Sequence, residues 1–468
     1  MYLKDKLNQY AKEDYYPFHM PGHKRNTQLT GFFNPYEIDI TEIDGMDNMH
    51  DAKGVIKNSM ERAARLYQSE HTYFLINGST SGNLIGICAS TKKGDKILIA
   101  RNCHKSAYQA IFLNELNPVY LYPQFNQKKG IQCGYTAAYI EEMLIKHPDV
   151  KLVMLVSPTY EGVISEIDKI AEIVHKRGIP LMVDEAHGAH FGFCEGFPKS
   201  SVQQGADIVV HSVHKTLPAF TQTALLHING SLVDAEKIKY YYSVFQSSSP
   251  SYIFMCGIDH CMELIENRGD ELFENLKDML DAFYKKTEQL QHIQVLQPEA
   301  GRDCSKLVIS TRNTNMTGPQ LYDILLEKYK LQMEMVAKDY VLGIASIGDT
   351  REGFKRLEKA LFEIDKMAEI RESVDNKAEI NYESVQNETI MNSYEVLHQS
   401  RHEILFAESE GQTAGAFVNV YPPGIPLLAP GERISALVIR KIESYLKAGL
   451  EIQGLRDKKF ISIVNREG

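Results

Sequence analysis

The sequence lacks three features that would indicate other classes of protein. Positive charge is not in excess, because 51 Lys and Arg stand against 61 Asp and Glu for a formal net charge of −10, and nucleic-acid surfaces need clustered cations. No apolar run approaches the roughly 20 residues that span a bilayer. The seven cysteines are scattered without a C-x-x-C pair, which favours reduced thiols over a zinc site. We therefore expect no metal, and no nucleic-acid or membrane partner.

The remaining composition is that of an ordinary globular protein, with 43% hydrophobic and 24% charged residues. The N-terminal residues MYLKDKLNQYAKEDYY carry charges where a secretory signal has its apolar stretch, so we expect a cytoplasmic protein. At 468 residues the chain is too long for one hydrophobic core, and several domains are expected.

Apolar runs alternate with amphipathic stretches between about residues 53 and 230. The runs lack polar alternation, as expected of strands that are buried on both faces. They are KILIA (96–100), VYLY (119–122), KLVMLVS (151–157), IPLMVDEA (179–186), DIVVHSVHK (207–215) and ALLHI (224–228). The stretches 136–147 and 167–178 between them have helical spacing. This repetition predicts an α/β domain with a mostly parallel sheet.

The rest of the chain divides into smaller units. A long helical stretch is predicted at about 268–292. It is followed by three apolar β-rich runs, 306–310, 331–336 and 340–347. Two further helices are predicted to start after the polar residues Thr317 and Asp349. The predicted order is an N-terminal arm (1–52), a large domain (53–300), a small α+β domain (301–370), a linker (371–390) and a C-terminal domain (391–468).

The first motif that carries chemistry is FLINGSTSGNL (74–84), where a predicted strand runs into small hydroxyl residues between glycines. Backbone N–H groups at a helix N-terminus, together with Ser and Thr hydroxyls, form a phosphate cradle. The same pattern also occurs in ordinary turns. A P-loop is not present, because Asn83 follows Gly82 where a P-loop has lysine.

The second motif is PLMVDEAHGAHFGF (180–193), which places Asp184 at the C-terminal end of a buried strand. Open α/β sheets bind ligands at this position. A buried carboxylate needs a cationic partner, and a protonated pyridine nitrogen would be one. The residues from Asp184 to His187 also spell a helicase box, but a helicase would need the P-loop that the sequence lacks.

The third motif is DIVVHSVHKTLPAFTQ (207–222), in which a buried strand runs into Ser212, His214 and Lys215. A lysine at a strand end either extends its amine to solvent or serves in a site. Desolvation and a neighbouring cation would lower its pKa and free the amine to form a Schiff base.

Together the three motifs predict a site for pyridoxal 5′-phosphate. This cofactor needs a phosphate cradle, a carboxylate for its pyridine nitrogen and a lysine, all at one edge of a sheet. Asp184 and Lys215 are about one strand-helix crossover apart in the sequence, which predicts that they end neighbouring elements of one sheet.

Longer strings give the chain a family resemblance. It resembles the Orn/Lys/Arg decarboxylases, bacterial enzymes of the aspartate-aminotransferase fold that decarboxylate basic amino acids. The similarity covers nearly the whole chain. The strings that carry it are FHMPGHK (18–24), DITEIDGMDNMH (39–50), NGSTSGN (77–83), RNCHKS (101–106), SPTYEG (157–162), VDEAHGAHFG (183–192), SVHKTLPAFTQ (212–222) and YPPGIPLL (421–428).

The resemblance implies a role for each motif residue. Lys215 would form the Schiff base, Asp184 would pair with the pyridine nitrogen, and His104 would stack on the ring face opposite Ala186. His187 would lie near the ring. The phosphate would be bound by hydroxyl residues and one imidazole, which are Ser79, Thr80, Ser81, Ser212 and His214.

The resemblance also implies the reaction, a pyridoxal-phosphate-dependent decarboxylation in polyamine metabolism, carried out by a cytoplasmic homodimer with its active site at the interface. Arginine, which would give agmatine, is favoured because the chain resembles the short biosynthetic form without an N-terminal wing domain. Lysine and ornithine are the alternative substrates. Lys215 or His214 would return a proton to Cα.

Two questions stay open at this point. The distal cation of the substrate needs an anionic site, for which Glu42, Asp44 and Asp47 are candidates, although the same residues also fit a solvated acidic surface. The alternative functions are another lyase, aldolase or aminotransferase reaction on the same scaffold, or a catalytically silent paralogue with a regulatory role.

Overall fold

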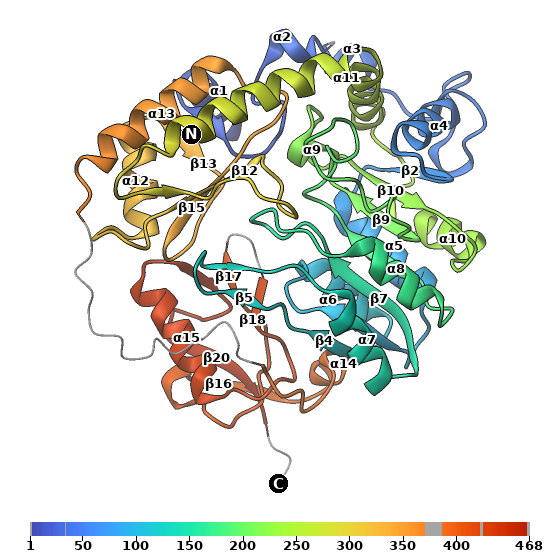
Figure 1. Cartoon of the computed structure of the whole chain (residues 1–468). Helices are drawn as coiled ribbons and strands as arrows, with labels where there is room; N and C mark the ends of the chain where they lie inside the picture. The colour runs from blue at the N-terminus through green and yellow to red at the C-terminus, as the bar shows by residue number, and fades with distance from the viewer. Residues whose placement is uncertain (1, 33, 370–385, 422–424, 466–468) are drawn as a thin grey trace.

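The computed structural model describes residues 2–32, 34–369, 386–421 and 425–465 (Figure 1). Most of the predicted linker, 371–390, therefore lies outside the described residues. Among the described residues, no helix combines the length and the apolar character that crossing a membrane requires.

The chain is built around a sheet of seven strands, β2 (His71–Leu75), β3 (Lys96–Ala100), β4 (Asn117–Leu121), β7 (Val150–Val156), β8 (Leu181–Asp184), β9 (Ile208–His211) and β10 (Ala224–Ile228). Their order across the sheet is β2-β10-β9-β8-β7-β3-β4. Neighbouring strands are parallel except for β10, which is antiparallel to both β2 and β9. The predicted α/β fold with a mostly parallel sheet is confirmed.

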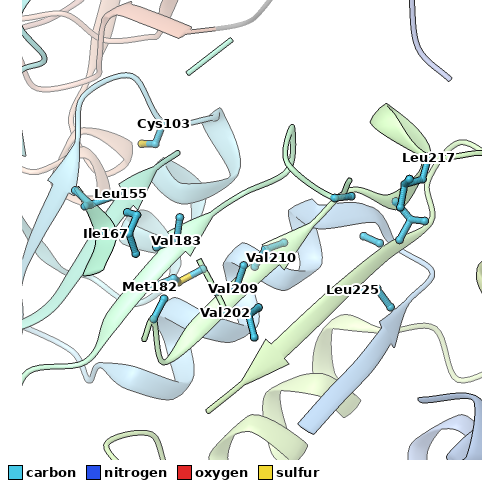
Figure 2. Close-up of a cluster of buried hydrophobic side chains, with 14 of the residues drawn as sticks. Cys103, Leu155, Ile167, Met182, Val183, Val202, Val209, Val210, Leu217 and Leu225 are labelled. Carbon is cyan, nitrogen blue, oxygen red and sulfur yellow. The ribbon is translucent and has the colours of Figure 1, made fainter. Parts of the chain in front are cut away.

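The strands β8, β9 and β10 are buried along their whole length, because they consist mostly of aliphatic residues without regular polar alternation. Val183 and Val209, on the adjacent strands β8 and β9, have no exposed surface. Figure 2 shows Met182, Val183, Val209 and Val210 packed together with Ile167. This core fixes the strand ends from which the site residues project.

Helices and a short hairpin accompany this sheet. They are α4 (Val55–Tyr67), α5 (Gly78–Ser90), α6 (Lys105–Leu113), β5 (Phe125–Asn126), β6 (Ile131–Gln132), α7 (Ala137–Lys146), α8 (Ile167–His175), α9 (Val213–Thr216), α10 (Ala235–Phe245) and α11 (Tyr252–Thr287). Glycine lets α5 lie directly on the strands, because a Cβ at Gly82 would come within 2.8 Å of both Leu75 and Val210. The helical stretch expected at about 268–292 is real but starts earlier, at Tyr252.

A smaller antiparallel sheet follows, with the order β11-β12-β15-β14. Its elements and the helices beside it are β11 (Gln294–Val295), β12 (Lys306–Ser310), α12 (Gly318–Glu327), β14 (Met335–Val336), β15 (Tyr340–Ile344) and α13 (Arg351–Asp365). Thr317 caps α12 as predicted, with its Oγ1 accepting a hydrogen bond from the backbone N–H of Gln320.

The apolar run 331–336 does not form one continuous strand. Its first part is β13 (Leu331–Met333), which pairs in parallel with β1 (Tyr16–Phe18) of the N-terminal segment. Its last part is β14, which pairs with β15. The chain changes sheets at Glu334, and the side chain at this position is therefore not part of either pleated surface.

The N-terminal segment also contains α1 (Leu3–Lys12), α2 (Thr27–Thr30), α3 (Pro35–Ile38) and η1 (Met49–Asp51). The C-terminal part contains α14 (Ser393–Leu397), β16 (Arg401–Leu405), η3 (Phe406–Glu408), β17 (Val418–Tyr421), β18 (Ile425–Leu428), α15 (Ala436–Lys447), β19 (Glu451–Gln453) and β20 (Phe460–Val464). It has a hydrophobic cluster of its own, which includes Val418, Leu428, Ile442 and Ile461. In Figure 1 this part lies beside the end of the central sheet that carries β4.

Candidate active site

A cavity of about 790 Å³ lies between the central sheet, the smaller sheet and the C-terminal part. Asp184, His187 and Lys215 line it from the central sheet, Glu334 lines it from the β13–β14 junction, and Ile442 lines it from α15. The second and third sequence motifs therefore reach one cavity, together with residues that lie far along the chain.

Asp184 is the last residue of β8, and its side chain is buried. Its Oδ2 accepts a hydrogen bond of 2.8 Å from Asn83 Nδ2, and its Oδ1 accepts one of 3.1 Å from the backbone N–H of Ala186. Both donors are neutral, and no ion pair forms to this carboxylate among the described residues. A buried carboxylate with neutral partners suits a cationic ligand group.

Lys215 lies on the one-turn helix α9 and not at a strand end as predicted, because β9 ends at His211 and Ser212 is the N-cap of the turn. Its Nζ is 3.0 Å from His187 Nε2. Burial lowers the pKa of this amine, the carboxylates of Asp184 and Glu334 oppose the shift, and the ammonium of Lys306 adds to it. A lowered pKa makes the neutral, nucleophilic amine more available.

Two imidazoles line the cavity with this amine. Burial lowers the pKa of His187 well below its usual value, and the ammonium groups of Lys215 and Lys306 act in the same direction. His187 Nδ1 has no hydrogen-bond partner among the described residues. His104 is the N-cap of α6 and accepts a hydrogen bond from the backbone N–H of Ser106, while burial lowers its pKa to about 4. Both rings are therefore neutral at neutral pH.

The hydroxyl residues expected to bind phosphate gather at the N-terminus of α5. Ser79 and Thr80 lie in its first turn, where backbone N–H groups have no intrahelical partner and attract anions. Ser212, the N-cap of α9, reaches this turn, and its Oγ donates a hydrogen bond of 2.8 Å to Ser79 Oγ. Ser81 differs, because its hydroxyl donates to a carbonyl of its own turn and accepts a hydrogen bond of 2.7 Å from Gln246 Nε2.

His214 is oriented by its own neighbours. Its Nδ1 donates a hydrogen bond of 2.9 Å to the carbonyl of Thr223, and its carbonyl accepts one of 2.7 Å from the backbone N–H of Gly22. Burial lowers its pKa to about 4. The described lining of the cavity contains His187 and not His214, and His187 Nε2 lies within hydrogen-bond distance of Lys215 Nζ.

The three acidic residues considered for the distal cation lie outside the described lining of the cavity. Asp47 caps α4, since its carboxylate accepts hydrogen bonds of 2.8–3.3 Å from the backbone N–H groups of Asn48, Lys53, Gly54, Ile56 and Lys57. Burial raises the pKa of Asp47, but these hydrogen bonds outweigh it and hold the pKa at about 2. Asp44 is exposed, and Glu42 is half-buried. In this chain Asp47 thus has a structural role.

Glu334 is a cavity residue that the sequence motifs did not reveal. Its Oε1 accepts a hydrogen bond of 2.8 Å from Tyr160 Oη, and its Oε2 accepts one of 2.9 Å from the backbone N–H of Met20. The available signal was a single charged residue inside the apolar run LQMEMV. Asn83 was missed for a similar reason, because its buried amide reaches a carboxylate 101 positions away in the sequence.

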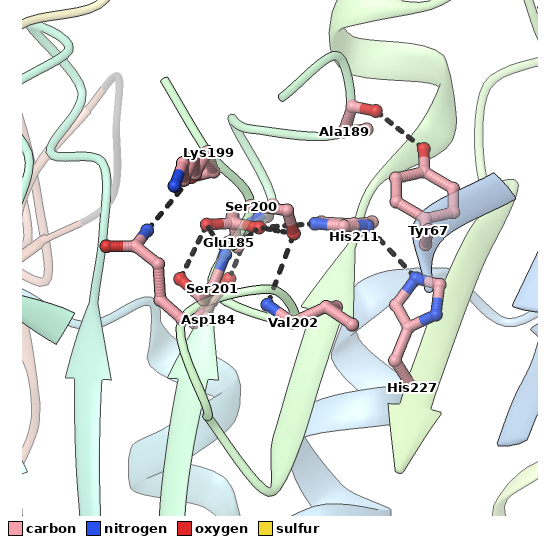
Figure 3. A network of polar contacts seen from close by, with 12 residues as sticks. Tyr67, Asp184, Glu185, Ala189, Lys199, Ser200, Ser201, Val202, His211 and His227 are labelled. Atoms are coloured by element: carbon pink, nitrogen blue, oxygen red, sulfur yellow. Dashed lines mark hydrogen bonds and ion pairs between the residues drawn. The ribbon is translucent and has the colours of Figure 1, made fainter. Parts of the chain in front are cut away.

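A second polar network lies next to these residues inside the sheet (Figure 3). Glu185 is buried, and its carboxylate accepts hydrogen bonds from Ser200 Oγ at 2.7 Å, Ser201 Oγ at 2.6 Å and His211 Nε2 at 2.6 Å. His211 Nδ1 is in turn 3.0 Å from His227 Nε2. The network joins β8, β9 and β10, and so it holds the strands that carry the site in register.

The residues present fit pyridoxal phosphate. Lys215 supplies the amine, Asp184 supplies a carboxylate, and the N-terminus of α5 supplies an anion cradle, which are the three groups this cofactor needs. The Asp184 carboxylate has only neutral hydrogen-bond donors, and His187 Nδ1 has no partner among the described residues. A ligand in the cavity could supply the missing partners.

Known proteins are similar to this chain in sequence and fold. The family model "Orn/Lys/Arg decarboxylase, major domain" matches residues 2–316, and "Orn/Lys/Arg decarboxylase, C-terminal domain" matches residues 376–455. An arginine decarboxylase of Halalkalibacterium halodurans is 31% identical over 465 residues, covering 96% of this chain and 94% of that protein. A lysine decarboxylase of Hafnia alvei is 26% identical and covers 62% of this chain and 42% of that protein.

A solved structure has the same fold as this chain. The lysine decarboxylase of Francisella novicida superposes with a TM-score of 0.78 at 19% identity, covering 98% of this chain and 80% of that one. The family models together with the relative that spans nearly the whole chain establish the relationship. The chain belongs to the Orn/Lys/Arg decarboxylase family.

Proposed function

We propose that this chain decarboxylates arginine to agmatine, in polyamine metabolism and with pyridoxal phosphate as cofactor. The observation that carries the cofactor assignment is the Lys215 amine in one cavity with the buried Asp184 carboxylate, whose partners are neutral. The reaction type is supported by the decarboxylase family to which the chain belongs. Arginine is favoured over lysine because the relative named arginine decarboxylase matches almost the full chain, whereas the one named lysine decarboxylase matches a smaller part at lower identity.

The cofactor would be held by the groups that fit it, with Asp184 toward its ring nitrogen, Lys215 at its aldehyde carbon, and Ser79, Thr80 and Ser212 around its phosphate. When bound, pyridoxal phosphate supplies an electron sink for the electron pair that Cα keeps as CO₂ leaves. The roles expected for Ser81 and His214 remain predictions; the hydrogen bonds of Ser81 favour an indirect role for it.

The protein side chains prepare the charges and protons of the reaction. Asn83 and the backbone N–H of Ala186 fix the orientation of the Asp184 carboxylate, so a negative charge is in place before any positive charge develops on a ligand. Lys215 is the proposed proton donor to Cα of the substrate. His187 Nε2, 3.0 Å from Lys215 Nζ, is the proposed group that exchanges protons with this amine.

The distal guanidinium of the substrate needs an anion inside the cavity, and we assign this role to Glu334. Its carboxylate lines the cavity with Lys215, and Tyr160 and the backbone of Met20 hold it in one orientation. A carboxylate with fixed orientation can accept paired N–H bonds from a guanidinium. Glu42 and Asp44 stay candidates only for a contact with the cavity of a second copy of the chain.

We also propose a homodimer with a cytoplasmic location. The segment before and at the start of α4 exposes several large apolar side chains, among them Tyr36 at 91%, Ile43 at 51%, Met46 at 43% and Val55 at 54%. Contiguous exposed apolar surface is typical of an interface. All seven cysteines are free, which fits a reducing compartment.

The test is product analysis with the cofactor-loaded protein. Arginine, lysine and ornithine are offered separately, and amine products, CO₂ and ammonia are measured, with Lys215→Ala as the inactive control. We expect agmatine and CO₂ from arginine, without ammonia. Cadaverine or putrescine as the main product would change the substrate assignment, and ammonia or a transferred amine would replace decarboxylation with another reaction of this scaffold. A bound cofactor without turnover of any substrate would indicate a silent paralogue.

A further inference from the structure

A buried lysine that the proposed reaction does not use lies behind the cavity. Lys306 is the first residue of β12, and both its side chain and that of Asp303 are 0% exposed. Withdrawing an ammonium group from water is costly unless the group is paired and hydrogen-bonded. Hydrophobic residues would fill the same space at less cost, so the position of Lys306 calls for a functional reason.

The contacts of Lys306 lead toward the site. Its Nζ donates a hydrogen bond of 3.3 Å to the backbone carbonyl of His187 and lies 3.6 Å from Asp303 Oδ2. Asp303 is itself fixed, because its carboxylate accepts hydrogen bonds from the backbone N–H of Ser305 at 2.9 Å, from Ser305 Oγ at 2.8 Å and from His190 Nε2 at 3.3 Å. The ammonium therefore lies beside a carboxylate whose orientation is set by three hydrogen bonds of its own.

His187 connects the two lysines of the site. Its backbone carbonyl accepts the hydrogen bond from Lys306, and its ring Nε2 lies 3.0 Å from Lys215 Nζ. The aliphatic part of the Lys306 side chain packs closely against Gly162. A Cβ atom added to that glycine would lie only 2.7 Å from Lys306 Cγ. A shift of Lys306 would thus be passed to the peptide of His187 and from there to the ring that faces the amine.

The charges around the amine come from several elements. The ammonium of Lys306 lowers the pKa of both Lys215 and His187, after burial as the main cause. The carboxylates of Asp184 and Glu334 act on Lys215 in the opposite direction. A second cation near a lysine is a recognised way to favour its neutral amine.

We propose that Lys306 is a positioning residue for the reaction, which fixes His187 against the Lys215 amine and keeps a second positive charge close to that amine. The inference rests on the proposed function, because it concerns the same lysine. Asp303 belongs to the same unit, since it anchors the ammonium of Lys306.

A purely structural role is the alternative, and the chain offers a matched control for it. Lys24 is also buried, and its Nζ donates hydrogen bonds of 2.9 Å to the carbonyl of His19 and 2.7 Å to that of Ile344. Lys24→Met therefore removes a buried ammonium with two backbone contacts without touching His187.

The experiment compares wild type, Lys306→Met, Lys306→Arg and Lys24→Met as cofactor-loaded proteins. The absorbance of the lysine-bound cofactor is titrated with pH, and kcat and KM for arginine are measured. Lys306→Met should move the spectral transition to higher pH, because a cation near the amine is lost. Its kcat should fall by roughly tenfold to a hundredfold, as small misplacements in a site do, with a smaller change in KM. Lys306→Arg should keep the transition near that of wild type, and Lys24→Met should lower stability without moving it.

An unchanged transition and kcat in Lys306→Met would overturn the inference, as would an equal shift in Lys24→Met. If Lys306→Met does not fold, Asp303→Asn decides the question. This variant removes the opposing charge and keeps the ammonium, so the transition should move to lower pH, and an unmoved transition would count against the inference. A wild-type protein without any spectrum of lysine-bound cofactor would instead overturn the proposed function.

Discussion

Asp184 is the single residue on which the proposed electron sink depends most directly. Asp184→Asn should lower kcat by on the order of a hundredfold or more, because an amide cannot stabilise a protonated ring nitrogen by charge. Asp207→Asn is a matched control, because Asp207 is also buried and accepts hydrogen bonds from His175 and from the backbone N–H of Leu181. Asp207 directly precedes β9, whereas Asp184 is the last residue of β8, so the two carboxylates lie at opposite edges of the sheet. Steady-state kinetics should show the loss in Asp184→Asn only. Full activity of that variant would contradict the assignment.

Glu334 should determine affinity for the distal group of the substrate. Glu334→Gln keeps the shape of the side chain but removes its charge, and a hydrogen bond to a charged group contributes about 1.5–3 kcal/mol. We therefore expect KM for arginine to rise by roughly tenfold to a hundredfold, with a smaller change in kcat. Glu42→Gln serves as the comparison. If KM rises in Glu42→Gln and not in Glu334→Gln, the guanidinium is bound by the segment 39–50 and not inside the cavity.

Two partly buried histidines should make the cofactor-free protein sensitive to acid. Burial lowers the pKa of His104 and of His214 from 6.5 to about 4. Between these values the unfolded chain binds protons that the folded chain does not, so the free energy of unfolding should fall as pH falls from about 6.5 to about 4. Each histidine can contribute up to about 3 kcal/mol over this range. Urea unfolding at several pH values would measure the slope, and His214→Gln should reduce it. An equal slope in the variant would contradict the prediction.

At the scale of secondary structure, an element is predictable from the sequence where neighbouring residues determine it, and not where distant parts of the chain do. The run 96–100 coincides with β3, and 224–228 coincides with β10, because unbroken aliphatic runs report burial on both faces. The turn α9 was not predicted, since four residues without a side-chain cap have no helical signal. The division of 331–336 between two sheets was not predictable, because the sheet that a strand joins is a property of the whole fold.

The same distinction applies to the site. Asp184, His187 and Lys215 lie in motifs next to strand ends, so their meeting in one cavity follows from the predicted sheet. Glu334 lies at the junction of β13 and β14, and Lys306 begins β12 of the smaller sheet. The packing of these elements on the large sheet has no signature in the sequence. Their side chains could be connected with the site only through three-dimensional contacts.

The start of α4 is an element whose stability should depend on one carboxylate. Asp47 accepts hydrogen bonds from several backbone N–H groups at this helix N-terminus. Asp47→Ala should lower the free energy of unfolding by about 1–2 kcal/mol, the usual cost of losing a helix cap. Asp44→Ala, on the exposed neighbouring residue, should change it little. Urea unfolding measures both. A raised KM in Asp47→Ala with unchanged stability would restore the substrate role considered for Asp47 from the sequence.

At the scale of the whole molecule, the cavity depends on the C-terminal part staying in place. Arg101, next to β3, and Glu432, in the C-terminal part, form an ion pair of 2.9 Å with side chains that are 8% and 1% exposed. The guanidinium also lies over the rings of Tyr108 and Tyr120. Because Arg101 and residues of α15 line the same cavity, this pair fixes one of its walls against another.

Glu432→Gln should therefore affect stability and substrate binding together. Breaking a buried ion pair by removing one charge costs about 3–5 kcal/mol, since the other charge stays buried without its partner. The exposed pair between Glu388 and Arg433, 2.7 Å long, is the matched control, and Glu388→Gln should cost about 1 kcal/mol or less. In Glu432→Gln, the free energy of unfolding in urea and KM for arginine should both change. In Glu388→Gln, the free energy of unfolding should change little and KM should stay constant. If stability falls while KM stays constant, the wall formed by α15 does not contact the substrate, and recognition belongs to the two sheets alone.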